Sequence, residues 1–413
     1  MVQKTLIKTS ILVLFCFFLL ASSAGYVMRT QSQTVCLGVS LFIVIAIALK
    51  KMKIHTDRVC ILAVLLLCIL GALSSIIASD PFDYMLCPII AWIIAMMFVL
   101  SVTKIEFEKM YVYTIAIICV VSIVAYILFF FFPRIITSFP VVINSAGGGA
   151  YNLFITTVPF SYGHIARMQG IFWEPGAFQI FVLWALLILR VSDSIYKKDI
   201  LSIIFIVSMI LSFSTTAYIE LIMVLLIILK NGSRRKKCKN AIKIVLALVV
   251  VSGIVEIAFG IENVWRSVFA DKFSSITIGN AMVGTAKNES TQVRLDSIFY
   301  PIQVFLHNPI LGGGSNGLLN LRMVMGHGMT TCTPINFFAT NGIVYGSIAI
   351  YMCYCLSSVL SKSANEKILR FLLILFSIST EDMNGMVFFD IILLYGFLYG
   401  RKRSKVVSME EVR

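Results

Sequence analysis

VCILAVLLLCILGALSSIIA, residues 59–78, is a stretch of twenty residues without a single charged side chain. As a helix it would be about 30 Å long, which matches the hydrocarbon thickness of a bilayer. In lipid, the backbone must satisfy its own hydrogen bonds, and only helices or closed barrels do so. The apolar run is continuous and does not alternate with polar residues, so it predicts a transmembrane helix.

Similar apolar runs recur along the whole chain. The protein has 413 residues, of which 59% are hydrophobic and 13% are charged, whereas a soluble domain carries roughly 25% charged residues. We therefore predict an all-α integral membrane protein with about 12 transmembrane helices in a single membrane domain, and we exclude a soluble protein. The predicted spans lie near residues 9–28, 33–49, 59–78, 84–102, 110–132, 171–190, 200–213, 215–230, 241–260, 333–360, 367–380 and 386–400.

The basic residues are distributed unevenly between the two sides of these spans. One side carries 26 of the 34 Lys and Arg residues, and the other side carries eight. The positive-inside rule then places both termini in the cytoplasm. The net charge of +14 and the run RRKKCK (234–239) accordingly indicate topology anchors, and no nucleic-acid partner is expected. The apolar run after Lys4 and Lys8 is interpreted as the first span, although its cleavage as a signal peptide stays open.

Two connections between the spans are long, and both are predicted to face outward. They cover residues 133–170 and 261–332, and they contain aromatic residues, glycines and seven of the eight outward Lys and Arg residues. Long loops of this kind are usually functional or disordered, and their mixed composition favours function. Of the ten cysteines, only Cys332 lies in a long outward loop, and no CxxC pair occurs, so neither a disulfide framework nor a metal site is expected.

A polar stretch divides the apolar residues 200–230. SFSTT (212–216) predicts a tight turn between two short helices. Glu220 follows inside the apolar zone, where an acidic side chain is costly and is a functional candidate by default. The alternative is a structural Glu220 that hydrogen-bonds to nearby Ser or Thr hydroxyls, and Asp390 in the last span raises the same question.

The first long loop ends in RMQGIFWEPGAF (167–178), the most polar part of an apolar neighbourhood. Proline fits the first turn of a helix and pushes the preceding residue out of helical conformation, so a helix should begin at Glu174–Pro175. The start of a helix offers N–H groups and a partial positive charge, and Arg167 lies just upstream. Together they predict an anion site at the membrane surface with Glu174 as a candidate base. The alternative is a simple re-entry segment anchored by Trp173.

The second long loop carries a comparable set of polar residues. Arg294 lies in STQVRLDS, and His307 opens the stretch HNPILGGGSNG. An amphipathic helix is predicted at about 293–306, which contains Arg294 and ends just before His307. His307 is a candidate catalytic residue, and a structural role is the alternative.

The glycines after His307 formally match a dinucleotide fingerprint at Gly312, Gly314 and Gly317. We reject that interpretation because no strand–helix context surrounds them and the loop is predicted to lie outside the cytoplasm. A glycine-rich turn whose N–H groups approach a phosphate remains, and a flexible turn is the alternative.

These motifs resemble the bacterial O-antigen polymerase (Wzy-type) and O-antigen ligase superfamily. In that superfamily the first long loop ends in an Arg–Gly–Phe–Glu–Pro–Gly pattern, and the second carries an Arg and then His-x-Pro-x-x-Gly-x-Gly. The matching residues are Arg167, Gly170, Phe172, Glu174, Pro175 and Gly176 in the first loop, and Arg294, His307, Pro309, Gly312 and Gly314 in the second.

The resemblance implies glycosyl transfer at the periplasmic face of the bacterial inner membrane, from glycans linked to undecaprenyl pyrophosphate. On the residues that carry the resemblance we expect substrate binding at Arg167, Arg294, Gly312 and Gly314, and catalysis at Glu174 and His307. The pyrophosphate leaves as a stable anion, so positive charge placed on it assists the reaction, and a base takes the proton of the attacking hydroxyl. Neither a metal nor a cofactor is expected. The expected partners are the lipid-linked oligosaccharide, membrane lipid and a chain-length regulator protein.

Within the superfamily, the sequence favours a polymerase over a ligase. The ligase branch typically has a His-Asn-type pair about eleven residues before a Gly-x-x-Gly-like turn. The corresponding turn here is Gly342–Gly346, which places Thr331 and Cys332 at the pair, and His327 comes four residues too early. A lipid-linked oligosaccharide flippase or another transporter is the remaining alternative, but the paired repeats typical of such folds do not occur at a fixed period.

Overall fold

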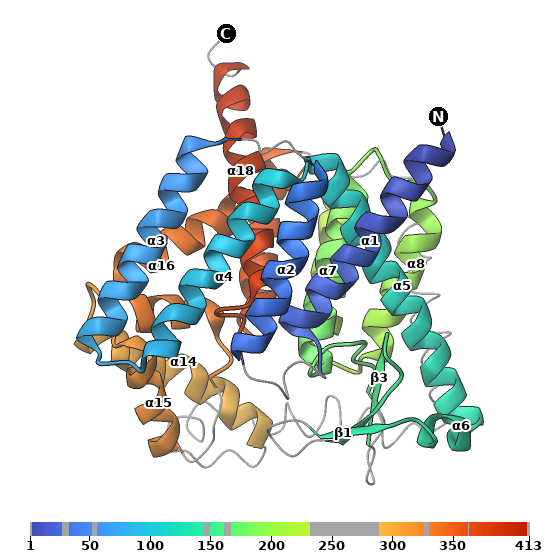
Figure 1. The fold of residues 1–413 in the computed structure, drawn as a ribbon, viewed down its shortest axis with the longest axis horizontal. Helices are drawn as coiled ribbons and strands as arrows, with labels where there is room; N and C mark the ends of the chain where they lie inside the picture. The colour runs from blue at the N-terminus through green and yellow to red at the C-terminus, as the bar shows by residue number, and fades with distance from the viewer. Residues whose placement is uncertain are drawn as a thin grey trace. The chain divides into compact units, whose positions relative to one another are not determined.

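The computed structural model is mostly helical (Figure 1). It describes residues 2–26, 33–51, 56–143, 149–160, 167–231, 289–325, 330–361 and 363–410. The chain divides into two compact units. Unit 1 comprises Met1–Ser32 and Ile105–Phe273, and unit 2 comprises Gln33–Lys104 and Ser274–Arg413.

The helices of unit 1 are built around α7. In chain order they are α1 (Val2–Ala24), α5 (Lys104–Phe131), α6 (Pro133–Thr137), α7 (Pro175–Val191), α8 (Lys198–Leu211) and α9 (Thr215–Asn231). Every residue of α7 from Ala177 to Leu189 is buried, and the helix packs against α8 and α9. A helix that is apolar on all sides is stable only when other elements cover it, as they do here.

A small antiparallel sheet lies in the first long loop, where the sequence predicted no strand. Its strands β1 (Val141–Ile143), β2 (Gly149–Asn152) and β3 (Thr157–Pro159) pair in chain order. Val158 of β3 packs with Ile136 of α6 and Ala125 of α5. The all-α class therefore holds for the predicted spans, and the strands are confined to a segment predicted to lie outside them.

The helices of unit 2 are built around α16 and α18. They are α2 (Gln33–Lys51), α3 (Arg58–Ile77), α4 (Phe82–Ser101), α14 (Glu289–His307), α15 (Gly314–Met325), α16 (Thr333–Val359), α17 (Ala364–Ile378) and α18 (Val387–Glu410). Helix α16 packs against α18, α17, α14 and α3, while α4 packs against α18, α2 and α3. The amphipathic helix predicted in the second long loop is therefore confirmed as α14.

All of the predicted spans except 241–260 coincide with a helix, and 241–260 lies outside the described residues. Among the residues that the structure describes, four helices are long and apolar enough to cross a membrane. They are Arg58–Ile77, Phe82–Ser101, Lys104–Phe131 and Thr333–Val359. A helical membrane protein is thus supported, while the total of about 12 crossings and the orientation of the termini stay predictions.

The division of residues 200–230 into two helices is confirmed. Helix α8 ends at Leu211 and α9 begins at Thr215, and Phe213 in the turn has a positive φ of 46°. The Ser212 hydroxyl stabilises this turn, because its Oγ donates a hydrogen bond to Met209 O at 2.7 Å.

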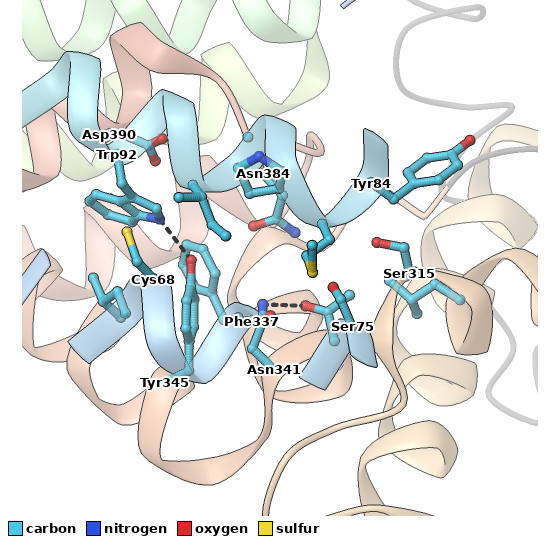
Figure 2. Close-up of a pocket in the computed structure, with 18 of the residues that line it drawn as sticks. Cys68, Ser75, Tyr84, Trp92, Ser315, Phe337, Asn341, Tyr345, Asn384 and Asp390 are labelled. Atoms are coloured by element: carbon cyan, nitrogen blue, oxygen red, sulfur yellow. Dashed lines mark hydrogen bonds between the residues drawn. The ribbon is translucent and has the colours of Figure 1, made fainter. Parts of the chain in front are cut away.

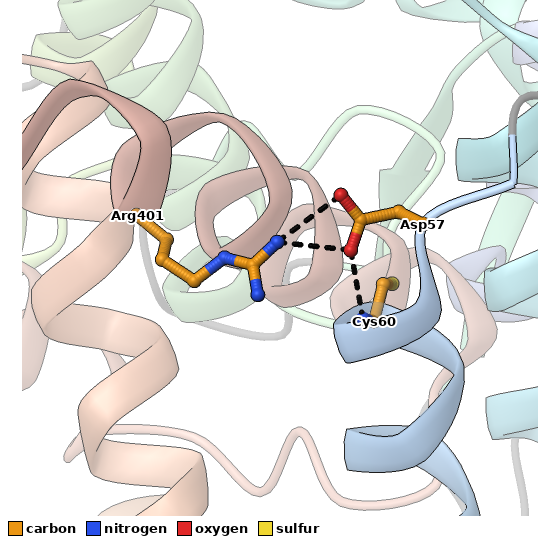
Figure 3. A network of polar contacts seen from close by, with 3 residues as sticks. All are labelled: Asp57, Cys60 and Arg401. Atoms are coloured by element: carbon orange, nitrogen blue, oxygen red, sulfur yellow. Dashed lines mark hydrogen bonds and ion pairs between the residues drawn. The ribbon is translucent and has the colours of Figure 1, made fainter. Parts of the chain in front are cut away.

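An ion pair joins α3 and α18 on the side of unit 2 that is predicted to face the cytoplasm (Figure 3). Asp57 caps the N-terminus of α3, where its Oδ1 accepts a hydrogen bond from Cys60 N at 3.0 Å. Arg401 Nη2 of α18 lies 2.9 and 3.1 Å from the two Asp57 oxygens. One carboxylate therefore both caps the N-terminus of α3 and pairs with Arg401 in the second half of α18.

Candidate functional site

The start of α7 has the geometry that the proline predicted. Glu174 is extended (φ −158°, ψ 162°), and Pro175 is the first helical residue. The Glu174 side chain makes no capping hydrogen bond to the first turn. Its Oε1 instead accepts a hydrogen bond from Trp173 Nε1 at 3.2 Å. The carboxylate is half-buried at the helix start, and helix capping does not account for it.

The segment before α7 is held on both sides by backbone hydrogen bonds. Tyr26 N donates to Ile171 O at 2.6 Å, just beyond the end of α1. Thr157 of β3 donates to Gly170 O from both its N–H, at 2.7 Å, and its hydroxyl, at 2.9 Å. Gly170 has φ +61°, and a Cβ there would lie 2.9 Å from the Phe178 ring. Strand β3 of the sheet thus holds in place the segment that leads to Glu174.

Arg167 lies at the C-terminal end of α8. The side chain is half-buried, and its Nε donates to Ser212 O at 3.3 Å. Its charge also acts on the Tyr218 phenol of α9. A cation is stabilised at the C-terminus of a helix, where carbonyl groups lack partners within the helix. Arg167 therefore has a structural contact in the protein, and its role in binding pyrophosphate stays a prediction.

The structure does not bring Arg294 and His307 together. Both belong to α14, where Arg294 is half-buried and His307 is the exposed last residue. They are thirteen positions apart, which corresponds to about 20 Å along a helix. If both act on substrate, they contact different parts of it.

The glycines after His307 have a packing reason. Gly312 has φ +74° and Gly314 has φ +64°, a conformation that favours glycine. A Cβ on Gly312 would collide with the Thr340 backbone, and a Cβ on Gly314 would lie 2.8 Å from the Asp80 carboxylate. The N–H of Gly312 donates to Asn308 O at 2.8 Å, so it is satisfied within the protein. The phosphate contact of these glycines stays a prediction, and close packing alone explains their presence.

Asp80 is a polar residue that the sequence did not single out. Its carboxylate accepts hydrogen bonds from Ser315 N at 2.9 Å and Asn316 N at 2.7 Å. It thereby satisfies N–H groups at the start of α15, which have no partner within the helix. Asp80 lies 235 residues before Ser315, and no local pattern in the sequence connects the two.

The predicted Gly342–Gly346 turn is a kink inside α16. Gly342 is the non-helical residue of this helix, with φ 78°. A Cβ at Gly342 would collide with the Ile310 carbonyl, and Ile343 N donates to Pro309 O at 2.9 Å. The backbone of the segment HNPIL (307–311) therefore packs directly against the backbone at the kink, which leaves no room for a side chain at Gly342.

We expect Gly342→Ala to lower the stability of the protein by about 2–4 kcal/mol, because it combines a positive φ with overpacking. Thermal unfolding of the purified protein in detergent measures this loss. The control is Gly38→Ala in α2, where a Cβ meets no atom within 4 Å. Alanine favours a helix over glycine by about 1 kcal/mol, so the control should be neutral or stabilising. Equal effects of the two substitutions would contradict the packing account.

The positions that correspond to the ligase pair have a structural role. Cys332 is the N-cap of α16, and Thr331 N donates to Ser297 Oγ of α14 at 2.9 Å. These residues join α14 to the start of α16. His327, the nearest histidine considered for the pair, lies outside the described residues.

Glu220 and Asp390, the two acidic residues inside predicted spans, are both buried. Glu220 is fully buried, and neither of its oxygens has a hydrogen bond. The Ser or Thr hydroxyl partners proposed for it are not found, and the side chain that acts on it is Gln179 of α7. Asp390 in α18 is 3% exposed and has one oxygen without a partner. A buried polar group without a hydrogen bond is costly, so both positions call for a reason beyond packing.

Among the described residues, no group of three or more His, Cys, Asp or Glu side chains is arranged to hold a metal ion. Comparison with known protein families and with curated proteins finds no match for this chain. The resemblance to the polymerase and ligase superfamily therefore rests on the sequence motifs and their order alone.

Proposed function

We propose that this protein is a polymerase of bacterial surface polysaccharide. It joins oligosaccharide repeat units linked to undecaprenyl pyrophosphate, at the periplasmic face of the inner membrane. The observation that carries the proposal is Glu174, a carboxylate at the start of a membrane helix with no capping hydrogen bond of its own. It lies in the motif that the superfamily resemblance assigns to substrate.

The proposed reaction forms one glycosidic bond and breaks one bond to phosphate. The hydroxyl oxygen of the acceptor sugar attacks the anomeric carbon of the donor sugar. The bond between that carbon and the pyrophosphate oxygen breaks, and lipid-linked pyrophosphate leaves as an anion. The hydroxyl proton passes to the base, for which Glu174 is the proposed residue.

The two arginines are proposed to stabilise the negative charge of the pyrophosphate groups. Arg167 and Arg294 each bind the pyrophosphate of a lipid-linked substrate, one of the donor and the other of the acceptor. A guanidinium is always charged and offers a planar fork of donors, which suits a leaving pyrophosphate. The two residues belong to different compact units of the chain.

A deletion strain tests the activity. Without a polymerase, a ligase still attaches one repeat, so lipopolysaccharide should show the core with a single repeat unit on a gel. The lipid-linked pool, measured beside it, should hold single units on the periplasmic leaflet. If the glycan is a capsule, those lipid-linked units are the expected sign.

The other activities give different results in the same strain. Loss of a ligase leaves long polymer on the lipid carrier and a bare core. Loss of a flippase leaves single units on the cytoplasmic leaflet. Either result would replace the proposed polymerase with the corresponding alternative.

A further inference from the structure

Unit 2 contains a cavity of about 220 Å³ between α3, α4, α15, α16 and α18 (Figure 2). The part contributed by α3 runs from Leu67 to Ser75, which is the half of this helix predicted to lie toward the outer side. The volume corresponds to roughly seven water molecules, at about 30 Å³ each, and is of the order of one sugar ring.

The wall of the cavity combines aromatic rings with hydrogen-bonding groups. The rings are Tyr84, Trp92, Phe337 and Tyr345, and the polar side chains include Ser75, Ser315, Asn341, Asn384, Asp382 and Asp390. None of the described lining residues is Lys or Arg. The wall therefore suits a ligand with apolar faces and many hydroxyl groups, and it offers no cation to a phosphate.

Asp390 is the group that most needs a ligand. It is 3% exposed, its Oδ2 has no hydrogen-bond partner, and it lines the cavity. It lies close enough to Cys68 and Tyr345 to act on both electrostatically (Figure 2). Both oxygens of a carboxyl group can accept hydrogen bonds, so the hydroxyl groups of a ligand would satisfy the Asp390 oxygen that has no partner.

Several side chains of the wall are held in place within the protein. Trp92 Nε1 donates to the Tyr345 hydroxyl at 2.9 Å, and Asn341 Nδ2 donates to Thr340 Oγ1 at 2.8 Å (Figure 2 shows both residues of the first pair). The Phe337 ring lies near that of Tyr345, with 6.2 Å between their centroids. A wall fixed in this way loses little freedom when a ligand binds.

We infer that this cavity binds one neutral sugar residue of the glycan, with Asp390 accepting hydrogen bonds from its hydroxyl groups. The inference rests on the proposed function, in that the glycan is the substrate which brings the sugar. A pyrophosphate is disfavoured because none of the described lining residues is a lysine or arginine that could balance its charge. A purely apolar ligand would leave the buried Asp390 oxygen unsatisfied. The cavity is thus a sugar subsite that is chemically distinct from the pyrophosphate-binding arginines.

Binding of simple glycosides tests this subsite directly. The full-length protein in lipid nanodiscs is mixed with a panel of methyl glycosides of neutral hexoses, 6-deoxyhexoses and N-acetylhexosamines, and saturation-transfer NMR reports which of them bind. We expect at least one to bind, and Asp390→Asn to weaken its binding by about tenfold, because one of the two accepting oxygens of the side chain is replaced by an NH2 group that cannot accept a hydrogen bond from a sugar hydroxyl. Asn384→Ala, a milder change of the same wall, should also weaken binding.

Glu220→Gln is the matched control, since it removes another buried intramembrane acid that does not line the cavity. It should leave glycoside binding unchanged, and inorganic pyrophosphate should not displace the glycoside. The subsite is disproved if no glycoside of the panel binds, if Asp390→Asn and Asn384→Ala bind as the unchanged protein does, or if pyrophosphate competes. These results are independent of the deletion strain. If glycosides bind but the deletion strain makes a normal polysaccharide, the proposed polymerase activity is wrong and the sugar subsite stands. If no glycoside binds but the deletion strain makes only single repeats, the sugar subsite is wrong and the polymerase activity stands.

Discussion

Arg294→Ala is expected to reduce chain extension by about 10²–10³-fold, the usual cost of removing a group that stabilises developing charge. The reason is that Arg294 is proposed to bind the pyrophosphate of one of the two lipid-linked substrates. On the donor it would stabilise the negative charge that develops on the leaving pyrophosphate, and on the acceptor it would hold the attacking sugar in place. The measurement is the glycan ladder of a deletion strain that carries the variant, with the amount of membrane-inserted protein determined by immunoblot. Only single repeats should remain.

Arg294→Lys should restore part of the ladder, because lysine keeps the charge but lacks the two-donor fork. Arg134→Ala is the matched control, since Arg134 is an exposed arginine of α6 on the same predicted side of the membrane. It should give a normal ladder. A normal ladder from Arg294→Ala would refute its assignment to pyrophosphate.

Arg294 is a cleaner test than Arg167. Within the described part of the chain, Arg294 has no hydrogen bond or ion pair that its removal would break. Arg167 donates to Ser212 O at the end of α8, so its replacement by alanine would also leave a carbonyl group unsatisfied. Loss of activity in Arg167→Ala alone would therefore mix folding with substrate binding.

The helices could be predicted because their signals are local. A continuous apolar run specifies a membrane helix by its length, and proline at position 175 specifies where α7 begins by its fixed φ. The polar stretch 212–216 likewise marks the turn between α8 and α9. Each of these features depends on residues within one or two helical turns.

The sheet and the caps could not be predicted because they depend on residues far apart. Strands of three or four residues, such as Val141–Ile143, carry too little alternation to be recognised, and their pairing is set by tertiary contacts. Asp80 caps a helix that begins at Gly314, and Gly312 packs against Thr340. Conformationally special glycines look alike in sequence whether they approach a phosphate or another part of the chain.

The cavity in unit 2 shows the same limit for the site. Its wall is drawn from residues as distant as Gln33 and Asp390, and only a fold can gather them. One hint was present in the sequence, since Asp390 is an acid inside a predicted span. Composition could not reveal that the acid lies among aromatic and amide side chains.

Glu174→Gln is expected to lower the rate of polymerisation by about 10²–10⁴-fold, the range for loss of a general base. Glutamine has nearly the same shape as glutamate, and the Glu174 side chain makes no capping hydrogen bond. The stability of the protein should therefore change by no more than about 0.5 kcal/mol. The ladder on a gel measures the first quantity, and thermal unfolding in detergent measures the second.

Asp83→Asn is the matched control for Glu174→Gln. Asp83 is an exposed carboxylate in the first turn of α4, at another helix start on the same predicted side of the membrane. Its replacement removes an acid that favours the helix dipole by about 0.3–1 kcal/mol, so a small loss of stability with a normal ladder is expected. A loss of stability in Glu174→Gln that parallels its loss of activity would assign Glu174 to the structure of α7. An unchanged ladder in Glu174→Gln would show that deprotonation of the acceptor hydroxyl does not depend on this carboxylate. Glu174 would then not be the base.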